Sequence, residues 1–308
     1  LKRLESSVYS FRLTLEKLKN NHTSILSTVK DFNDGKISDD QLSSVLVGED
    51  IDDEDVANIG ESFIGDKVKI NLADMDLLSW EYDLKTDLKV VEFLLSEMHK
   101  ITPEHDFKLQ DIKSHIDNKI KNPINFNNKK IIVFTAFADT ADYLYGHISK
   151  HIQSAHQLHS AEVTGSKNTT TVNGSYDFQS ILTLFSPISK EKDVLMPNDS
   201  NEIDILIGTD CISEGQNLQD CDYLINYDIH WNPVKLMQRI GRVDRRMSPE
   251  NEEQLIIDHP EVASSRGKVS FWNFLPPDEL NDILTLYNRV TQKTLLISKT
   301  LGIEGRQL

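Results

Sequence analysis

The chain of 308 residues is long enough to bury a full hydrophobic core, as one large domain or as two. Its 33 Lys and Arg residues are outnumbered by 49 Asp and Glu residues, and the net charge of -16 opposes nonspecific attraction to nucleic acid, so any such contact must be local. Two cysteines without a CxxC motif exclude a disulfide framework. Without a signal peptide or a membrane-spanning apolar run, we expect a soluble, cytoplasmic protein with no membrane partner. The chain begins at Leu1 and not at methionine, which suggests a fragment of a longer polypeptide.

Helical patterns dominate the first part of the chain. Apolar residues at helical spacing predict a core-facing helix over 1–29 and two further helices within 84–120, which Pro103 separates. Pro123 and the Asn-rich run behind it predict a linker. We therefore expect a mainly helical segment over residues 1–122.

An acidic and uneven stretch over 31–87 separates these predicted helices. Asp53–Val56 has the sequence DEDV, but no apolar strand precedes it as a metal-binding DExx box requires. We interpret residues 49–61 as a solvated loop or the start of a helix. The stretch GESFIGDK at 60–67 misses the GxxxxGK[ST] phosphate loop, because Asp66 intervenes before the lysine.

Apolar runs in the second half of the chain predict the strands of a parallel sheet. Residues 131–137 (IIVFTAF) form a β-rich run with a helical pattern behind it, which is the order of an α/β domain. A helix is expected over 176–185, and buried strands at 205–207 and 223–227. Polar residues follow the last two strands and indicate a nucleotide-facing edge, because ligands collect at the carboxyl ends of parallel strands.

Three histidines, His151, His156 and His159, follow the first of these strands. Their spacing does not place all three on one helical face, and the run holds no suitably placed carboxylate. We therefore expect solvent-facing histidines and no metal site.

A helix with several arginines is predicted behind Pro233, a residue that suits the first turn of a helix. Gln238, Arg242 and Arg245 recur at i, i+4 and i+7 and so share one face. Two guanidinium groups on that face suit the charge that develops on a γ-phosphate during transfer, because guanidinium is always charged and matches phosphate oxygens. The alternative is a solvated basic face on a surface helix.

Several stretches taken together resemble a known family. TDCISEGQNLQ, followed by LINYDIHWNP and then by QRIGRVDR, resembles motifs V and VI of superfamily two helicases, and IIVFTAF resembles motif IV. The stretch SEGQNLQ is most similar to the bacterial Swi/Snf-like branch. The resemblance implies an α/β fold with a RecA-like parallel sheet flanked by helices over 123–270, which is the second lobe of a two-lobe motor. It also implies a helical tail over 271–308 that packs on this lobe.

The resemblance assigns roles to the matching positions. Arg242 and Arg245 match arginine fingers, Arg239 matches the supporting arginine, and Gln238 opens motif VI. The positions expected to line the nucleotide are Glu214, Gly215, Asn217, Gln238 and Arg239.

Five residues are expected to contact nucleic acid. Thr209 and Asp210 open motif V, which by resemblance couples nucleic acid to nucleotide. Thr135 has helix capping as an equal alternative, and Thr164 and Gly165 would suit any tight turn.

The two missing motifs determine the expected mechanism. An ATPase of this class needs a phosphate loop for the phosphates and an acidic box for Mg²⁺. We therefore expect ATP with Mg²⁺ to be bound mainly by an upstream lobe of the same polypeptide, and this chain alone to be inactive. Glu214 and Asn217 depart from the DEAD-box pattern, which favours translocation on duplex DNA.

Two other classes of function stay open. One is a degenerate lobe that serves as a nucleic-acid or protein binding module. The other is a metal nuclease built on the acidic clusters, which is disfavoured because those carboxylates lie in an irregular segment.

Overall fold

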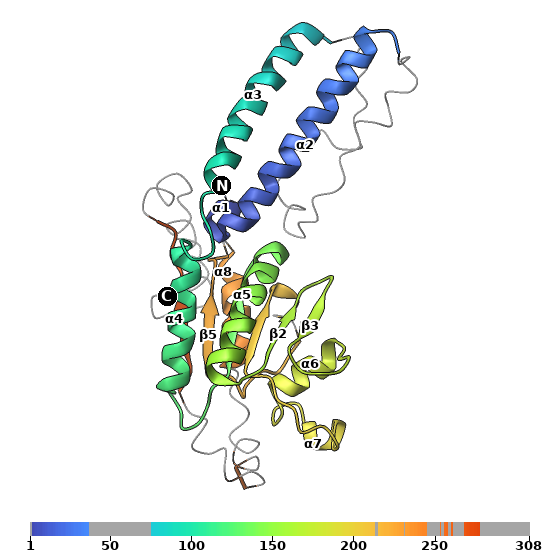
Figure 1. The fold of residues 1–308 in the computed structure, drawn as a ribbon. Helices are drawn as coiled ribbons and strands as arrows, with labels where there is room; N and C mark the ends of the chain where they lie inside the picture. Colours follow the sequence, from blue (N-terminus) through green and yellow to red (C-terminus); the bar gives the residue numbers. More distant parts are fainter. Residues whose placement is uncertain are drawn as a thin grey trace, which may run out of the picture. The chain divides into compact units, whose positions relative to one another are not determined.

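The structure is a computed structural model that describes residues 2–36, 75–212, 215–230, 232–244, 253, 256–257, 260 and 268–277. Contacts within the chain form two compact units. One consists of Leu1–Tyr9 with Pro103–Leu308, and the other is Ser10–Thr102. Figure 1 shows the described elements of both.

The unit Ser10–Thr102 is built on two long helices that lie side by side in Figure 1. Helix α2 (Val8–Asn33) and helix α3 (Leu77–Met98) meet through an apolar cluster. In that cluster Leu15 packs with Val91 and Leu95. The helical pattern predicted for this part of the sequence is thereby confirmed.

A six-stranded sheet forms the centre of the other unit. The strand order is β3-β2-β4-β1-β5-β6, and every neighbouring pair is parallel except β2 with β3. The strands are β1 (Ile131–Phe134), β2 (Ser160–Val163), β3 (Asn168–Thr170), β4 (Ile205–Gly208), β5 (Tyr223–Asn226) and β6 (Ser270–Asn273).

Helices cover both faces of this sheet (Figure 1). Along β1, Ile131 and Val133 join one core cluster while Ile132 and Phe134 join another, because successive side chains of a strand point to opposite faces. Helices α4 (Phe107–Lys121) and α5 (Ala138–His156) complete the first cluster. The second cluster contains residues of α6 (Phe178–Phe185) and the end of α8 (Pro233–Val243), and the short α7 (Lys192–Leu195) follows α6 in the chain.

The expected fold class, a parallel sheet flanked by helices with a helical N-terminal segment, is confirmed. Helix α4 buries its apolar face against the sheet, so its contacts group it with the strands and not with the lead-in predicted over 1–122. The three predicted domain ranges stay predictions. Residues 49–61, and the part of the predicted tail beyond residue 277, lie outside the described residues. No described helix is long and apolar enough to cross a membrane.

Candidate nucleotide and nucleic-acid site

The carboxyl ends of four parallel strands meet at one edge of the sheet. Thr135 follows β1, Thr164 follows β2, and Thr209 follows β4. The Thr135 backbone N–H donates to the Gly208 carbonyl at 3.0 Å. The Thr209 backbone N–H donates to the Val163 carbonyl at 3.2 Å. The five residues predicted to contact nucleic acid therefore all lie in segments that follow strands at this edge of the sheet.

Arg239 of α8 is fully buried, and its guanidinium group contacts neighbouring residues of the same unit. Its Nε and Nη2 donate to the two carboxylate oxygens of Asp210 at 2.7 and 3.0 Å. Its Nη1 donates to Asn226 Oδ1 at 3.0 Å, and the guanidinium carbon lies 5.2 Å from the centre of the Phe134 ring. These contacts fasten α8 to the turn after β4 and to the end of β5. They leave Arg239 no exposed surface with which to line a nucleotide, so its placement is that of a support.

Helix α8 begins where the sequence predicts. Asn232 caps the helix by accepting a hydrogen bond from the Val234 backbone N–H at 3.1 Å, and Pro233 occupies the first turn. Gln238 and Arg242, one turn apart, are both partly exposed. The shared face predicted for these two residues is thus present.

The loop after β4 closes against the end of α8. Arg242 Nη1 donates to the Gln216 carbonyl at 3.5 Å, and the Leu218 backbone N–H donates to the Arg242 carbonyl at 3.2 Å. Gly215 is exposed and has a φ of 69°, a conformation that favours glycine, and Asn217 is also exposed. Arg242 therefore lies beside two of the residues predicted to line the nucleotide. The predicted residues Glu214 and Arg245 lie outside the described residues.

A buried acceptor lies one turn before Arg242. Gln238 Oε1 is buried and accepts no hydrogen bond from the described residues. Leaving such an atom unpaired costs about 1–3 kcal/mol, so it is better suited to a site that a further group completes.

Lys190 adds a cation to the same loop, and the sequence reasoning missed it. Its Nζ donates to Gln216 Oε1 at 2.8 Å, and burial lowers the pKa of Lys190. Lys190 belongs to the segment between α6 and α7, and no motif in the sequence singles it out.

Asp228, which follows β5, is buried and gathers three hydrogen bonds. Its Oδ2 accepts from Thr135 Oγ1 and from Ser6 Oγ, each at 2.6 Å, and its Oδ1 accepts from the Ala136 backbone N–H at 2.7 Å. Ser6 is the last residue of α1 (Lys2–Ser6). The Thr135 hydroxyl is therefore engaged inside the lobe and not turned toward a phosphate. Asp228 and Ser6 were missed because 222 positions separate them in the sequence, and no local pattern joins them.

Two further buried charges lie next to Asp228. Lys108 of α4 donates from Nζ to the carbonyls of Glu5 and Ser6 at 2.7 and 3.0 Å, and its Nζ lies 4.2 Å from the centre of the Tyr227 ring. Burial, reinforced by the negative charge of Asp228, raises the pKa of Glu5 to about 7. Burial lowers the pKa of Lys108. Ionisable side chains thus connect α1 and α4 to the end of β5.

The Thr164 hydroxyl bonds within the tight turn after β2, which is the alternative to a nucleic-acid contact. Its Oγ1 accepts from the Lys167 backbone N–H at 3.1 Å, while Gly165 at the tip is exposed. Lys167 pairs with Asp142, and its Nζ lies 3.1 Å from the Glu162 carboxylate. Burial raises the pKa of Glu162 to about 7, with a smaller contribution from Asp142 and an opposing one from Lys167.

Thr209 and Asp210 are partly exposed, and the Thr209 hydroxyl donates to Cys211 Sγ at 3.4 Å. Within the described residues, the grouped side chains that could hold a metal ion are Asp117, His151 and His156, and none of these three lies at the carboxyl edge.

A comparison with protein families assigns the centre of this chain. Residues 113–247 match the family model described as the helicase conserved C-terminal domain. The matched range runs from α4 to the end of α8 and includes Arg239 and Arg242. The family match is therefore confined to the part of the chain that holds α4, the strands β1 to β5 and α8.

Two curated proteins are similar over parts of their length. The chain is 54% identical over 44 residues to an uncharacterized ATP-dependent helicase, YqhH, of Bacillus subtilis (strain 168), which is 14% of this chain and 8% of that protein. It is 22% identical over 169 residues to the putative ATP-dependent DNA helicase fml2 of Schizosaccharomyces pombe (strain 972), which is 55% of this chain and 19% of that protein. The matched stretches thus span less than a fifth of these relatives.

Three solved structures are similar at low identity. The C-terminal part of the Fun30 ATPase domain has a TM-score of 0.40 at 16% identity and covers 68% of this chain and 54% of its own. Domain 2 of the Mss116p DEAD-box helicase has a TM-score of 0.32 at 14% identity, with coverages of 64% and 72%. The Pyrococcus furiosus Hef helicase domain has a TM-score of 0.34 at 18% identity, with coverages of 70% and 35%. These values do not choose between branches of helicases, so the Swi/Snf-like assignment stays a prediction.

Proposed function

We propose that the chain is the C-terminal, RecA-like half of an ATP-dependent nucleic-acid translocase of the Swi/Snf-like branch. ATP with Mg²⁺ is held mainly by an upstream lobe of the same polypeptide, and Arg242 and Arg245 reach its γ-phosphate when the lobes close. The two curated relatives are named as ATP-dependent helicases. A guanidinium group stabilises the charge that develops on the phosphate during transfer.

The position of Arg242 carries this proposal. The buried pair between Arg239 and Asp210 holds α8 on the carboxyl edge. Arg242, three residues further along, is partly exposed beside the exposed Gly215 and Asn217. A surface helix with a solvated basic face would not need its preceding arginine buried as an anchor.

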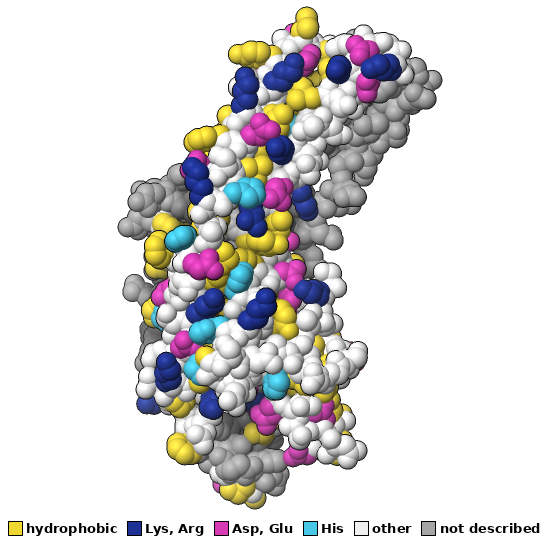
Figure 2. All heavy atoms as spheres, in the orientation of Figure 1, with side chains coloured by type: hydrophobic (Ala, Val, Ile, Leu, Met, Phe, Trp, Pro, Cys, Tyr) yellow, Lys and Arg dark blue, Asp and Glu magenta, His cyan; other side chains and the backbone are white. Residues whose placement is uncertain are grey.

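Duplex DNA is the proposed track, and its contacts are local. On the face drawn in Figure 2, basic and acidic side chains are interspersed and do not form one basic surface. The exposed tip at Gly165 and the turn at Thr209 and Asp210 are the proposed contact points, through backbone N–H groups and hydroxyls. We assign Thr135 and Thr164 to positioning these turns, because their hydroxyl groups bond within the lobe.

ATP hydrolysis tests the proposal. The full-length protein that contains this chain should hydrolyse ATP, and duplex DNA should accelerate it more than single-stranded DNA or RNA does. The 308-residue chain alone should show no turnover under the same conditions. Turnover by the chain alone would refute the shared site, and absence of turnover by the full-length protein on every nucleic acid would favour a binding module that has lost the chemistry.

A further inference from the structure

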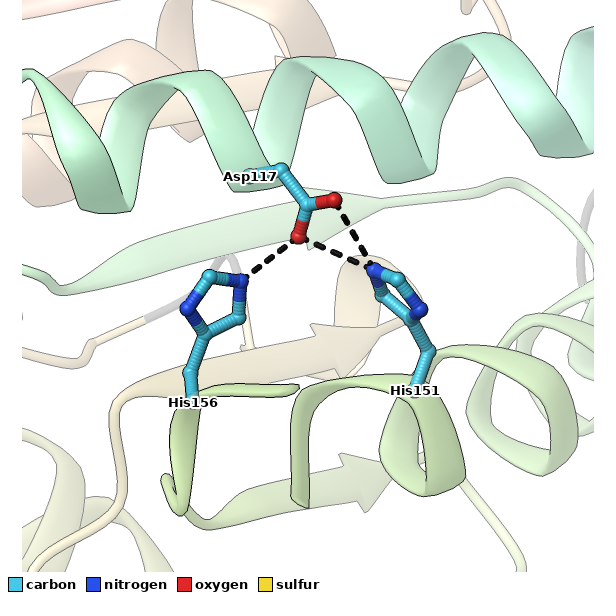
Figure 3. A group of neighbouring side chains, drawn as sticks. All are labelled: Asp117, His151 and His156. Atoms are coloured by element: carbon cyan, nitrogen blue, oxygen red, sulfur yellow. Dashed lines mark hydrogen bonds and ion pairs between the residues drawn. The ribbon is translucent and has the colours of Figure 1, made fainter. Parts of the chain in front are cut away.

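Three ligating side chains from two helices meet at the amino edge of the sheet, away from the carboxyl edge described above. Asp117 belongs to the last turns of α4, and His151 and His156 belong to the end of α5. Helix α5 starts at the carboxyl end of β1 and ends just before β2 begins, so its last residues lie at the opposite edge from Arg242. Figure 3 shows both imidazole rings turned toward the Asp117 carboxylate.

The ring nitrogens converge on one carboxylate. His151 Nε2 lies 2.9 and 3.0 Å from the two oxygens of Asp117, and His156 Nε2 lies 2.7 Å from Oδ1. The two rings are steeply inclined, with an interplanar angle of 80° and centres 6.4 Å apart. One ligand atom from each residue can be chosen so that all three lie within 4.8 Å of one another.

This donor set suits a transition metal. Two imidazole nitrogens and one carboxylate oxygen are ligands that Zn²⁺ accepts, whereas Mg²⁺ and Ca²⁺ prefer oxygen alone. A tetrahedral zinc ion with bonds of about 2.0–2.1 Å holds its ligand atoms roughly 3.4 Å apart.

The three side chains are also accessible from solvent. Their exposed fractions are 25% for Asp117, 31% for His151 and 12% for His156, so an ion can enter from solvent and keep a water ligand.

We infer that Asp117, His151 and His156 form a binding site for a divalent transition metal ion, with Zn²⁺ as the best fit, that cross-links α4 to α5. The ion takes the Nε2 lone pair of each imidazole in place of the Nε2–H that bonds to Asp117, so a neutral ring keeps its proton on Nδ1 and a protonated ring releases its second proton to solvent. One carboxylate oxygen supplies the third ligand and water supplies the fourth. Because the ligands come from two helices that pack on the same face of the sheet, binding favours the folded lobe.

The inference is independent of the proposed ATP chemistry. The histidine run predicts no metal site, because its spacing does not place the three rings on one face and it holds no suitable carboxylate; Asp117 comes from the preceding helix. His159, the third histidine of that run, lies apart from the cluster and bonds through Nδ1 to Thr171 Oγ1 at 3.2 Å.

Cobalt binding tests the site. The full-length protein, without nucleotide, is titrated with Co²⁺, whose visible absorption reports tetrahedral coordination. Wild type and the control variant His159→Gln should bind one Co²⁺ equivalent with this absorption. Asp117→Asn and His156→Gln should each lack this equivalent or bind it at least tenfold more weakly. Equal stoichiometry and affinity in all four proteins would overturn the inference.

A second measurement needs only the wild-type protein. Zn²⁺ should protect His151 and His156 from modification by diethyl pyrocarbonate, as located by mass spectrometry, and should leave His159 reactive. If Zn²⁺ leaves the modification of His151 and His156 unchanged, the cluster is a hydrogen-bonded contact between two helices and the inference fails.

Discussion

Arg239 and Asp210 form a two-point ion pair that joins α8 to the turn after β4. Both contacts are short, at 2.7 and 3.0 Å, and the arginine is fully buried. The pair holds together two stretches that are far apart in the sequence. Arg242 lies on the same helix, three residues after Arg239.

We expect Arg239→Ala to lower the free energy of unfolding by about 3–5 kcal/mol, because it leaves a carboxylate and an amide oxygen without their donor. Denaturant unfolding of the chain measures this loss. Lys85→Ala is the control, since Lys85 is exposed on α3 in an i,i+4 pair with Glu81 at 2.5 Å, worth at most about 0.5 kcal/mol. Equal stability of the two variants would contradict the anchoring role.

Thr135→Val should lower the free energy of unfolding by about 1–3 kcal/mol, because it removes a buried hydrogen bond to Asp228 and keeps the side-chain shape. The affinity of the full-length protein for duplex DNA should stay within about twofold. A lower affinity for duplex DNA with an unchanged free energy of unfolding would show that Thr135 contacts nucleic acid.

Gly208→Ala should destabilise the edge. A Cβ at this position would lie 2.7 Å from the Val163 carbonyl and 2.7 Å from Ile212 Cδ1, so the turn that carries Thr209 must shift, at a cost of about 1–3 kcal/mol. Gly146→Ala on α5 is the matched control. No atom lies within 4 Å of its added Cβ, and alanine favours a helix, so that variant should be as stable as wild type or up to about 1 kcal/mol more stable.

Glu162 makes stability depend on pH. Burial raises its pKa from 4.5 to about 7, so between these values the folded chain keeps a proton that the unfolded chain has lost. The Glu162 contribution to stability is therefore lost progressively as the pH rises from about 4.5 to about 7. Glu162→Gln removes this dependence.

Comparing the unfolding free energies of wild type and Glu162→Gln at pH 5 and pH 8 isolates the effect. The variant should gain stability relative to wild type at the higher pH. Glu5 has a raised pKa in the same range but is present in both proteins, so its contribution cancels. A difference that is constant with pH would show that Glu162 ionises normally.

Much of the sheet was predictable because its strands are buried on both faces. The apolar runs at 131–137, 205–207 and 223–227 correspond to β1, β4 and β5. No sequence pattern predicts strand β3 (Asn168–Thr170), since it is short, polar and at the edge of the sheet.

The site could be predicted from the sequence only where its residues belong to one local motif. The spacing of Gln238 and Arg242 fixes their shared face, and Pro233 marks the start of the helix. The partners of Asp228 and of Asp117 lie on other elements, so only the folded chain reveals them. Helical spacing places Arg239 on the same face as the buried Leu236 and Val243, but its partners Asp210 and Asn226 lie on other elements and only the folded chain reveals them.

The turnover number for ATP hydrolysis by the full-length Arg242→Ala protein tests the central claim most directly, measured with saturating ATP and duplex DNA. An arginine finger contributes roughly a thousandfold or more to the rate, so turnover should fall by that factor while the unfolding free energy changes little. The Lys85→Ala protein should retain wild-type turnover. Unchanged turnover in Arg242→Ala would contradict the assignment of this arginine to the γ-phosphate.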